Sequence, residues 1–336
     1  MNALRAHSFI TTSSSPLRQV DAWPTLPAGV ILDRVAGVAV DSRGYVVVAH
    51  RGAAPLLRFT PEGQLDAVLG ADHVKTSIAY DLRGPIPIPL PARFWMHGLH
   101  IDRWDNIWLT DVSRHIVMKL SPSGELLLAL GEDGVAGCDP QRFNQPTHIC
   151  VVPSGEIYVT DGYGNSRVVR FSPEGKYLGE WGSRGTAPGE FHSPHVIVHD
   201  ADGYLYVSDR ENDRIQIFDQ KGALQAVWPD LHSVDGLCFS PDGTLYGSAG
   251  VDNVILRLAK DGKATDIWGS PGQFIYPHAL AFAPNGDLYT AETGDRWIVT
   301  GPLPAERYSI DRAGPEGSQV QRHTFVPSER SPSYST

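Results

Sequence analysis

The sequence is poor in cysteine and methionine, with three of each among 336 residues. Cys138, Cys150 and Cys238 are too few and too unevenly spaced for a disulfide framework, so we expect a reducing, cytoplasmic location. No apolar run reaches the roughly 18 residues that a membrane-spanning helix requires. The first twenty residues also lack the apolar segment of a secretory signal. These absences argue against a disulfide-stapled domain and against a membrane partner.

Basic residues are scarce as well. The chain has 28 Lys and Arg against 38 Asp and Glu, which gives a formal net charge of −10. No basic run interrupts this acidic balance, so the sequence indicates no nucleic-acid partner. Glycine and proline, in contrast, are abundant at 34 and 26 residues, and they punctuate the chain at regular intervals.

The stretch 191–218 defines a unit that recurs in outline six times. Each copy has a Pro- or Gly-marked entry, an alternating apolar strand, a Gly turn, a second strand, a polar corner and a third strand. Period-2 alternation closed by Gly turns is typical of short antiparallel strands. Self-similar units of about 40–50 residues with several strands are typical of β-propeller blades. We therefore predict an all-β protein, a six-bladed β-propeller.

The repeats occupy the middle of the chain. We expect residues 1–17 to be a disordered leader, residues 18–310 a single propeller domain and residues 311–336 a polar C-terminal tail. The sixth repeat lacks a clean outer strand, so a strand near Val20 is predicted to pair there and close the ring. A Pro-rich insertion at 71–93 cannot be a central strand and is expected to be a lid or a plain surface loop.

Aligning the repeats on their first strands places one residue of each at its inner start. In chain order these residues are Ala36, His97, Thr147, His195, Asp235 and His278. The three histidines fall in blades two, four and six, about 120° apart around the ring. Three imidazoles that converge and leave a fourth position open suit a catalytic zinc ion. The alternative is a set of unrelated channel or core histidines, which is how we interpret His100 and His148 outside this alignment.

The corners that follow the second strands supply further polar groups. Arg51 and Arg210 occupy the same corner position in blades one and four, opposite each other, and are predicted to bind a carboxylate above the metal. Two surface salt bridges are the alternative. Tyr163 lies between two glycines, so the turn exposes it, and nearby cations would favour its phenolate form as a general base.

These motifs resemble NHL-repeat propellers and, within them, the peptidyl-α-hydroxyglycine α-amidating lyase family, over most of the chain. The family's zinc-histidine motifs match Met96–Leu99, Pro194–Ile197 and Pro277–Leu280, and its tyrosine segment matches Asp161–Arg167. Its two arginine segments match Ser208–Gln216 and His50–Gly52. The resemblance implies Zn²⁺ held by His97, His195 and His278, with Tyr163, Arg51 and Arg210 as catalytic residues.

The sequence departs from the family pattern in three ways. Ala279 replaces an aspartate that binds calcium in the family, so calcium is not expected here. Gly164 and Asn144 replace the family's disulfide pair, which fits a reducing compartment. The sequence also shows no sign of the copper monooxygenase domain found in animal members, so the reaction type is expected to carry over while the substrate need not.

The leading hypothesis is a zinc-dependent lyase that cleaves the C–N bond of a carbinolamide next to a carboxylate. Its products would be an amide and glyoxylate or a similar oxo acid, and its partner a small-molecule substrate with a carboxylate. A metal-dependent lactonase or hydrolase is the first alternative, and it would use an oxygen-rich calcium or magnesium site. A non-catalytic NHL interaction scaffold with a filled, metal-free channel is the second.

Overall fold

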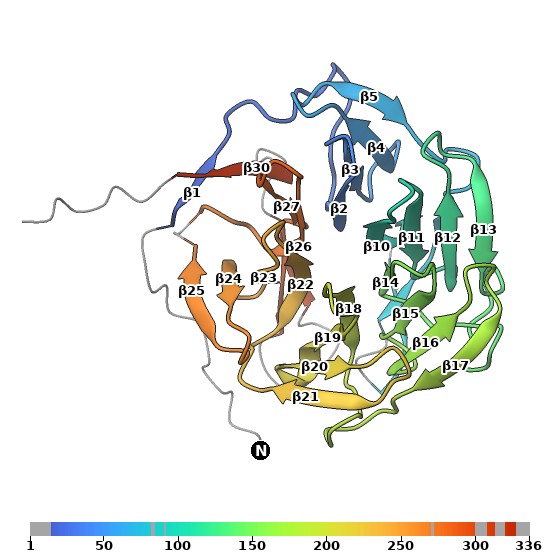
Figure 1. The fold of residues 1–336 in the computed structure, drawn as a ribbon. Helices are drawn as coiled ribbons and strands as arrows, with labels where there is room; N and C mark the ends of the chain where they lie inside the picture. Colours follow the sequence, from blue (N-terminus) through green and yellow to red (C-terminus); the bar gives the residue numbers. More distant parts are fainter. Residues whose placement is uncertain are drawn as a thin grey trace, which may run out of the picture.

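The computed structural model describes residues 15–81, 85–90, 92–269, 272–299, 308–312 and 320–326. These residues form six four-stranded antiparallel sheets, arranged as blades around a common central axis (Figure 1). The predicted all-β, six-bladed propeller is confirmed. Blades one to five are each built from four consecutive strands, and blade six combines strands from both ends of the chain.

The strand bounds are as follows. Blade one has β2 (Gly37–Val40), β3 (Val46–Ala49), β4 (Leu56–Phe59) and β5 (Leu65–Val68). Blade two has β10 (Met96–Ile101), β11 (Ile107–Asp111), β12 (Ile116–Leu120) and β13 (Leu126–Leu130). Blade three has β14 (His148–Val151), β15 (Ile157–Asp161), β16 (Arg167–Phe171) and β17 (Tyr177–Trp181). Blade four has β18 (Pro194–His199), β19 (Leu205–Asp209), β20 (Arg214–Phe218) and β21 (Leu224–Trp228), with the short 3-10 helix η1 (Arg210–Asn212). Blade five has β22 (Val234–Phe239), β23 (Leu245–Ala249), β24 (Val254–Leu258) and β25 (Ala264–Trp268).

Tight turns set the length of the strands, and apolar contacts hold the blades together. Gly203, between the first two strands of blade four, has a φ of +86°, a conformation that glycine adopts without steric cost. Buried apolar side chains from facing blades form a cluster at every blade interface. Between blades one and two, for example, Val47 and Leu56 pack with Leu109 and Met118. The core is therefore distributed around the ring.

Blade six closes the ring. Its strands, in spatial order from the channel outward, are β26 (Pro277–Phe282), β27 (Leu288–Glu292), β30 (Val320–Phe325) and β1 (Leu17–Gln19). Strand β1 pairs antiparallel with β30, so an N-terminal strand closes the ring as predicted. Hydrogen bonding between the two ends of the chain satisfies an edge that an open ring would expose.

The expected polar tail at 311–336 is wrong for residues 320–325, which form the third strand of this blade. The polar residues of β30 indicate a tail when the sequence is considered alone, but in the structure they make hydrogen bonds within blade six and its surroundings. Arg322 binds Asp287 at 2.6 Å, and the Gln321 side chain donates to the carbonyl of Gln273 at 3.3 Å. The propeller thus extends beyond residue 310. At the other end, Leu17 belongs to β1, and most of the expected leader lies outside the described residues.

The insertion at 71–93 does not join a blade. Its described residues make two short antiparallel ladders, one between β6 (Thr76–Ser77) and β9 (Arg93–Phe94), the other between β7 (Tyr80–Asp81) and β8 (Ile88–Pro89). A further pair outside the blades is β28 (Asp295–Val299) with β29 (Tyr308–Arg312). Within the described residues, no helix has the length and apolar character needed to cross a membrane.

Glu292, at the end of β27, is a buried acid with a structural role. Its Oε2 accepts a hydrogen bond from the backbone N–H of Ile275 at 2.7 Å, as Asp161 and Asp209 accept from N–H groups in blades three and four. The donors that reach Glu292 among the described residues are neutral. Burial therefore raises the pKa of Glu292 to about 8.

This raised pKa predicts a pH-dependent stability. The folded protein holds a proton on Glu292 that the unfolded chain, with an ordinary pKa of about 4.3, has lost, so stability falls as pH rises from about 4 through 8. Glu292→Gln keeps the neutral form at every pH. Between pH 6 and pH 9 we expect the melting temperature of wild type to fall further than that of the variant, by roughly 2–4 °C. Identical pH dependence of the two proteins in thermal scans would contradict this account of Glu292.

Candidate metal centre

A β-bulge positions each residue that faces the channel in four of the blades. The register between the first and second strands shifts by one residue at the start of β10, β18, β22 and β26. The segments that contain these shifts hold His97, His195, Asp235 and His278. A bulged residue leaves the regular ladder, and its side chain is re-aimed. The bulges therefore turn these four side chains out of the alternating pattern of their strands.

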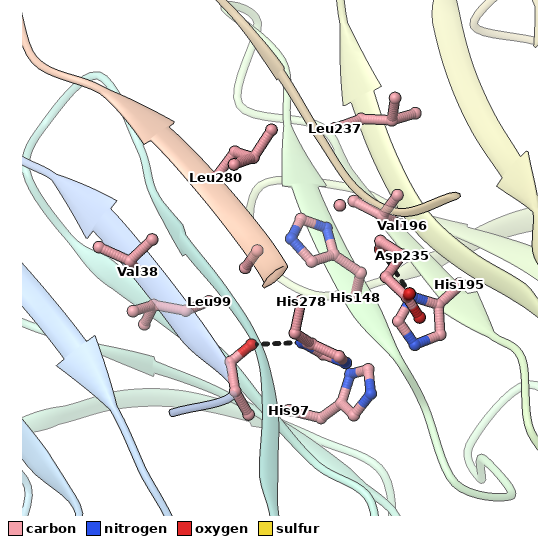
Figure 2. A pocket seen from close by; sticks show the side chains of 13 residues that line it. Val38, His97, Leu99, His148, His195, Val196, Asp235, Leu237, His278 and Leu280 are labelled. Carbon is pink, nitrogen blue, oxygen red and sulfur yellow. Dashed lines mark hydrogen bonds between the residues drawn. The ribbon is translucent and has the colours of Figure 1, made fainter. Parts of the chain in front are cut away.

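The three histidines converge as predicted. Their ring centroids lie 4.7 to 5.1 Å apart, and one ligand nitrogen from each lies within 4.8 Å of the others (Figure 2). His97 is 2%, His195 1% and His278 7% exposed. Within the described residues this is the group of histidine, cysteine and acidic side chains that could hold a metal ion.

Each of these imidazoles is fixed by the next blade around the ring. The Nδ1 atom of His97 lies 2.8 Å from the carbonyl oxygen of Thr147. The same contact joins His195 to the Asp235 carbonyl and His278 to the Ala36 carbonyl, both at 2.7 Å. A carbonyl oxygen can only accept, so Nδ1 carries the proton and donates it in each contact. The lone pair of each neutral imidazole is then on Nε2, where a metal would use it.

The electrostatic surroundings favour the neutral form of the ligands. Burial lowers the pKa of His97 and His195 well below the usual range, and lowers that of His278 to about 3. For His278, burial is the largest cause of this lowered pKa, and the positive charges of Arg51 and Arg210 contribute to it. Metal binding requires deprotonated ligands, so no proton has to leave these imidazoles at neutral pH.

Tyr163 borders the same centre. Its hydroxyl lies 2.8 Å from Nε2 of His97 and 3.1 Å from Nε2 of His195. Gly162 allows this approach, because a Cβ at that position would collide with the carbonyl oxygen of Pro194. On its outer side the half-buried Tyr163 ring packs against a cluster of Ala79, Trp95 and Val112. Ala79 belongs to the 71–93 insertion, so the insertion forms one wall beside the tyrosine.

Arg210 covers the other side of the tyrosine. Its guanidinium carbon lies 5.5 Å from the centre of the Tyr163 ring. The Nη1 atom of Arg210 donates to Asp235 at 3.1 Å, while Nε and Nη2 donate to Glu211 at 3.1 and 2.9 Å. Burial raises the pKa of Asp235 to about 6, and the charge of Arg210 opposes this rise. Arg51 lies across the ring, with its guanidinium carbon 4.7 Å from the centre of the Trp95 ring.

The donor set fits zinc better than calcium. Three neutral imidazoles around an open position match the ligands of catalytic zinc. Calcium takes six to eight oxygen ligands. The cavity beside the histidines is lined largely by apolar side chains, among them Val38, Leu99 and Leu280 (Figure 2). Among the described residues that line it, the one carboxylate is that of Asp235, which already accepts from Arg210 and from the backbone N–H of Gly250. This lining does not supply a calcium site built on carboxylates.

Sequence reasoning missed the use of three residues at the centre. Asp235 was aligned with the histidines, but nothing in the alignment paired it with Arg210. Trp95 lies two residues before His97, and the irregular insertion hid its place beside Arg51. Tyr276, two residues before His278, is 8% exposed and packs its ring beside Gly250. The positions of the family's lost disulfide are adjacent here, since the Gly164 N–H donates to the Asn144 carbonyl at 3.0 Å, and all three cysteines are free.

The fold and the centre together define a class of protein, an NHL-type β-propeller in which three converging histidines could hold a metal ion. The model of the NHL repeat matches residues 143–171. The chain is 30% identical to peptidyl-alpha-hydroxyglycine alpha-amidating lyase 2 of Drosophila melanogaster, over 82% of this chain and 72% of the relative. The chain therefore belongs to the peptidyl-α-hydroxyglycine α-amidating lyase family.

Other relatives agree with this assignment. The chain is 32% identical to the peptidylglycine alpha-amidating monooxygenase of Rattus norvegicus over 90% of its own length, and spans about a third (34%) of that relative. Among solved structures, a gluconolactonase from Xanthomonas campestris has a TM-score of 0.58 at 17% identity, covering 94% of this chain and 99% of that one. A streptogramin B lyase has a TM-score of 0.55 at 18% identity, covering 80% and 79%. At these identities the structural matches show the fold alone.

The centre predicts that removing one imidazole weakens metal binding. His195→Ala leaves two ligands, so we expect zinc affinity to fall more than about 100-fold, beyond the 10–100-fold typical of losing a supporting contact. His148→Ala is the matched control, because His148 lines the same cavity but lies outside the ligand group. Elemental analysis and competitive chelator titration measure both variants, with melting curves to confirm folding. Full occupancy and unchanged affinity in His195→Ala would reject the trihistidine site.

Proposed function

We propose that the protein is a zinc-dependent lyase that cleaves the C–N bond of a carbinolamide bearing a carboxylate, releasing an amide and glyoxylate or a similar oxo acid. The observation that carries the proposal is the Tyr163 hydroxyl, 2.8 and 3.1 Å from two of the three ligand nitrogens. Removal of the proton from a substrate hydroxyl requires a proton acceptor next to the metal, and Tyr163 lies at that place. Membership of the amidating lyase family supports the same reaction type.

His97, His195 and His278 would hold the metal. When bound there, zinc would act as a Lewis acid that lowers the pKa of the substrate hydroxyl. Tyr163, as phenolate, takes the hydroxyl proton. The oxygen electron pair forms the C=O bond of the oxo acid, and the C–N electron pair leaves with the amide nitrogen. The nitrogen then gains one proton, which the Tyr163 phenol can return, so the base is regenerated.

The two arginines supply positive charge on opposite sides of the reacting group. Arg210 lies against the Tyr163 ring, where it stabilises a phenolate. Arg51 is positioned across the channel on Trp95, and we assign it to the substrate carboxylate, which a planar guanidinium can bind through two hydrogen bonds. The buried wall of the insertion around Tyr163 keeps water from one side of the phenol.

The alternatives gain less support. The lactonase hypothesis needs an oxygen-rich site, while the single carboxylate that the described residues place in the cavity lining is bound to Arg210. The scaffold hypothesis gives no reason for three buried, bulge-positioned imidazoles with a common proton arrangement. The carboxylate-bearing small molecule as substrate remains a proposal, as does the exclusion of nucleic acid and membrane partners. The cytoplasmic location stays a prediction.

The experiment that tests the function combines metal analysis with a product assay. Purified protein loaded with zinc is incubated with an N-acyl hydroxyglycine and with ureidoglycolate, and glyoxylate is measured. Release from either compound, lost on chelation and restored by zinc, supports the proposal. Absence of glyoxylate from both, with one zinc bound per chain, would overturn it.

Tyr163→Phe tests the base. The variant removes only the hydroxyl, so we expect kcat to fall by about 10²–10⁴-fold, the usual contribution of general-base catalysis. Zinc content should stay at one per chain because the three imidazoles keep their carbonyl contacts. Undiminished turnover would remove Tyr163 from the mechanism. Loss of zinc together with activity would assign it to metal binding instead.

A further inference from the structure

Asp235, on blade five, contacts two residues of the candidate centre that lie on blade four, His195 and Arg210. Its backbone carbonyl accepts the Nδ1 proton of His195 at 2.7 Å. Its side chain accepts from Arg210 Nη1 at 3.1 Å through one oxygen and from the Gly250 N–H at 3.0 Å through the other. The side chain is completely buried, and the bulge in β22 aims it toward the channel. Arg210 in turn lies over the ring of Tyr163.

We propose that Asp235 is a positioning residue that fixes the guanidinium of Arg210 over Tyr163. The role rests on the proposed function, in which Arg210 stabilises the phenolate of Tyr163. Asp235 does not touch the reacting atoms itself. Through its carboxylate it sets the place and orientation of the charge that the phenolate meets.

The second acid on Arg210 cannot substitute for Asp235. The side chain of Glu211 is 37% exposed, whereas that of Asp235 is 0% exposed. Water screens the pair that Arg210 forms with the exposed Glu211, so this pair contributes little to holding Arg210. The buried pair is screened far less, and removing one partner leaves the other charge poorly compensated. Asp235 is therefore the acid that holds the guanidinium.

The surroundings leave room for an aspartate and little else. A Cβ on Gly250 would lie 2.7 Å from Oδ2 of Asp235 and 2.6 Å from Cδ1 of the Tyr276 ring. Gly250 and Tyr276 thus form a close-packed wall behind the carboxylate. An added methylene, as in glutamate, would have to displace this wall. An asparagine fits, but its amide can accept from only one of the two donors, Arg210 or Gly250, and carries no charge.

Asp235→Asn tests the assignment. The backbone contact to His195 persists, so zinc content should remain at one per chain. Because the change acts on phenolate stabilisation, we expect kcat to fall by about 10–100-fold while KM stays within about threefold of the wild-type value. This loss is smaller than the one expected when a stabilising donor is removed entirely. Glu211→Gln, the comparison variant, should lower kcat by less than about threefold. Wild-type kcat in Asp235→Asn would overturn the proposal.

A double-mutant cycle shows whether Asp235 acts through Arg210. Arg210→Met removes the guanidinium, and adding Asp235→Asn to it should change kcat by less than about threefold, because the two residues form one unit. Losses that multiply in the double variant would show that Asp235 acts independently of Arg210, and would reject the positioning role.

A spectroscopic measurement separates this inference from the proposed function. In zinc-loaded protein labelled with ¹⁵N-arginine, the Nη1–H signal of Arg210, the group that donates to Asp235, is assigned by its absence in Arg210→Met. We expect slow exchange of this proton with solvent in wild type and at least tenfold faster exchange in Asp235→Asn. Equal exchange rates would refute the role of Asp235 whatever the protein catalyses. Absence of lyase activity in wild type, with the exchange difference present, would refute only the proposed function.

Discussion

The hydrogen bond from each of the three channel imidazoles to a carbonyl of the next blade is the interaction on which the candidate metal centre depends. It joins blades two and three, four and five, and six and one, so every blade contributes either an imidazole or the carbonyl that orients one. The acceptor in each case is the backbone of the residue aligned with the histidines. The contact therefore depends on the fold and tolerates a change of side chain, as Ala36, Thr147 and Asp235 show.

Because these contacts run around the ring, closure of the ring is part of the chemistry. His278 comes from blade six, and its acceptor, Ala36, comes from blade one. The interface between those blades is held by an apolar cluster that includes Val38, Tyr289 and Val320. Val320 belongs to the C-terminal strand that β1 covers. The two ends of the chain thus stabilise the geometry of a centre that contains neither of them.

Much of this could be predicted from the sequence because the signals are periodic. Six copies of one strand pattern determine the fold class, and a fixed position in each copy brings His97, His195 and His278 to one axis. Tyr163 and Arg210 were predicted for the same reason, as members of aligned corners. Polar residues in a fixed repeat position are informative because the repeat itself supplies their place in space.

The remaining features depend on contacts that break the repeat. Strand β30 contains Gln321, Arg322 and His323. From the sequence alone these polar residues are typical of a C-terminal tail, because their hydrogen-bond partners are not visible in it. The bond of Arg210 to Asp235 joins blades four and five, and no sequence pattern records which acid an arginine selects. The insertion at 71–93 has no counterpart in other blades, so its contact with the Tyr163 ring could not be derived from alignment.

The charge of the centre explains why neutral ligands suit the proposed reaction. Three imidazoles add no negative charge, so a bound dication would keep its full positive potential in the channel. Carboxylate ligands would cancel part of it. Asp235, the one acid in the cavity lining within the described part of the chain, is balanced by Arg210. Arg51 adds a second cation on the opposite side. An acidic protein with a net charge of −10 thus concentrates positive charge where the proposed carboxylate substrate and phenolate base would both require it.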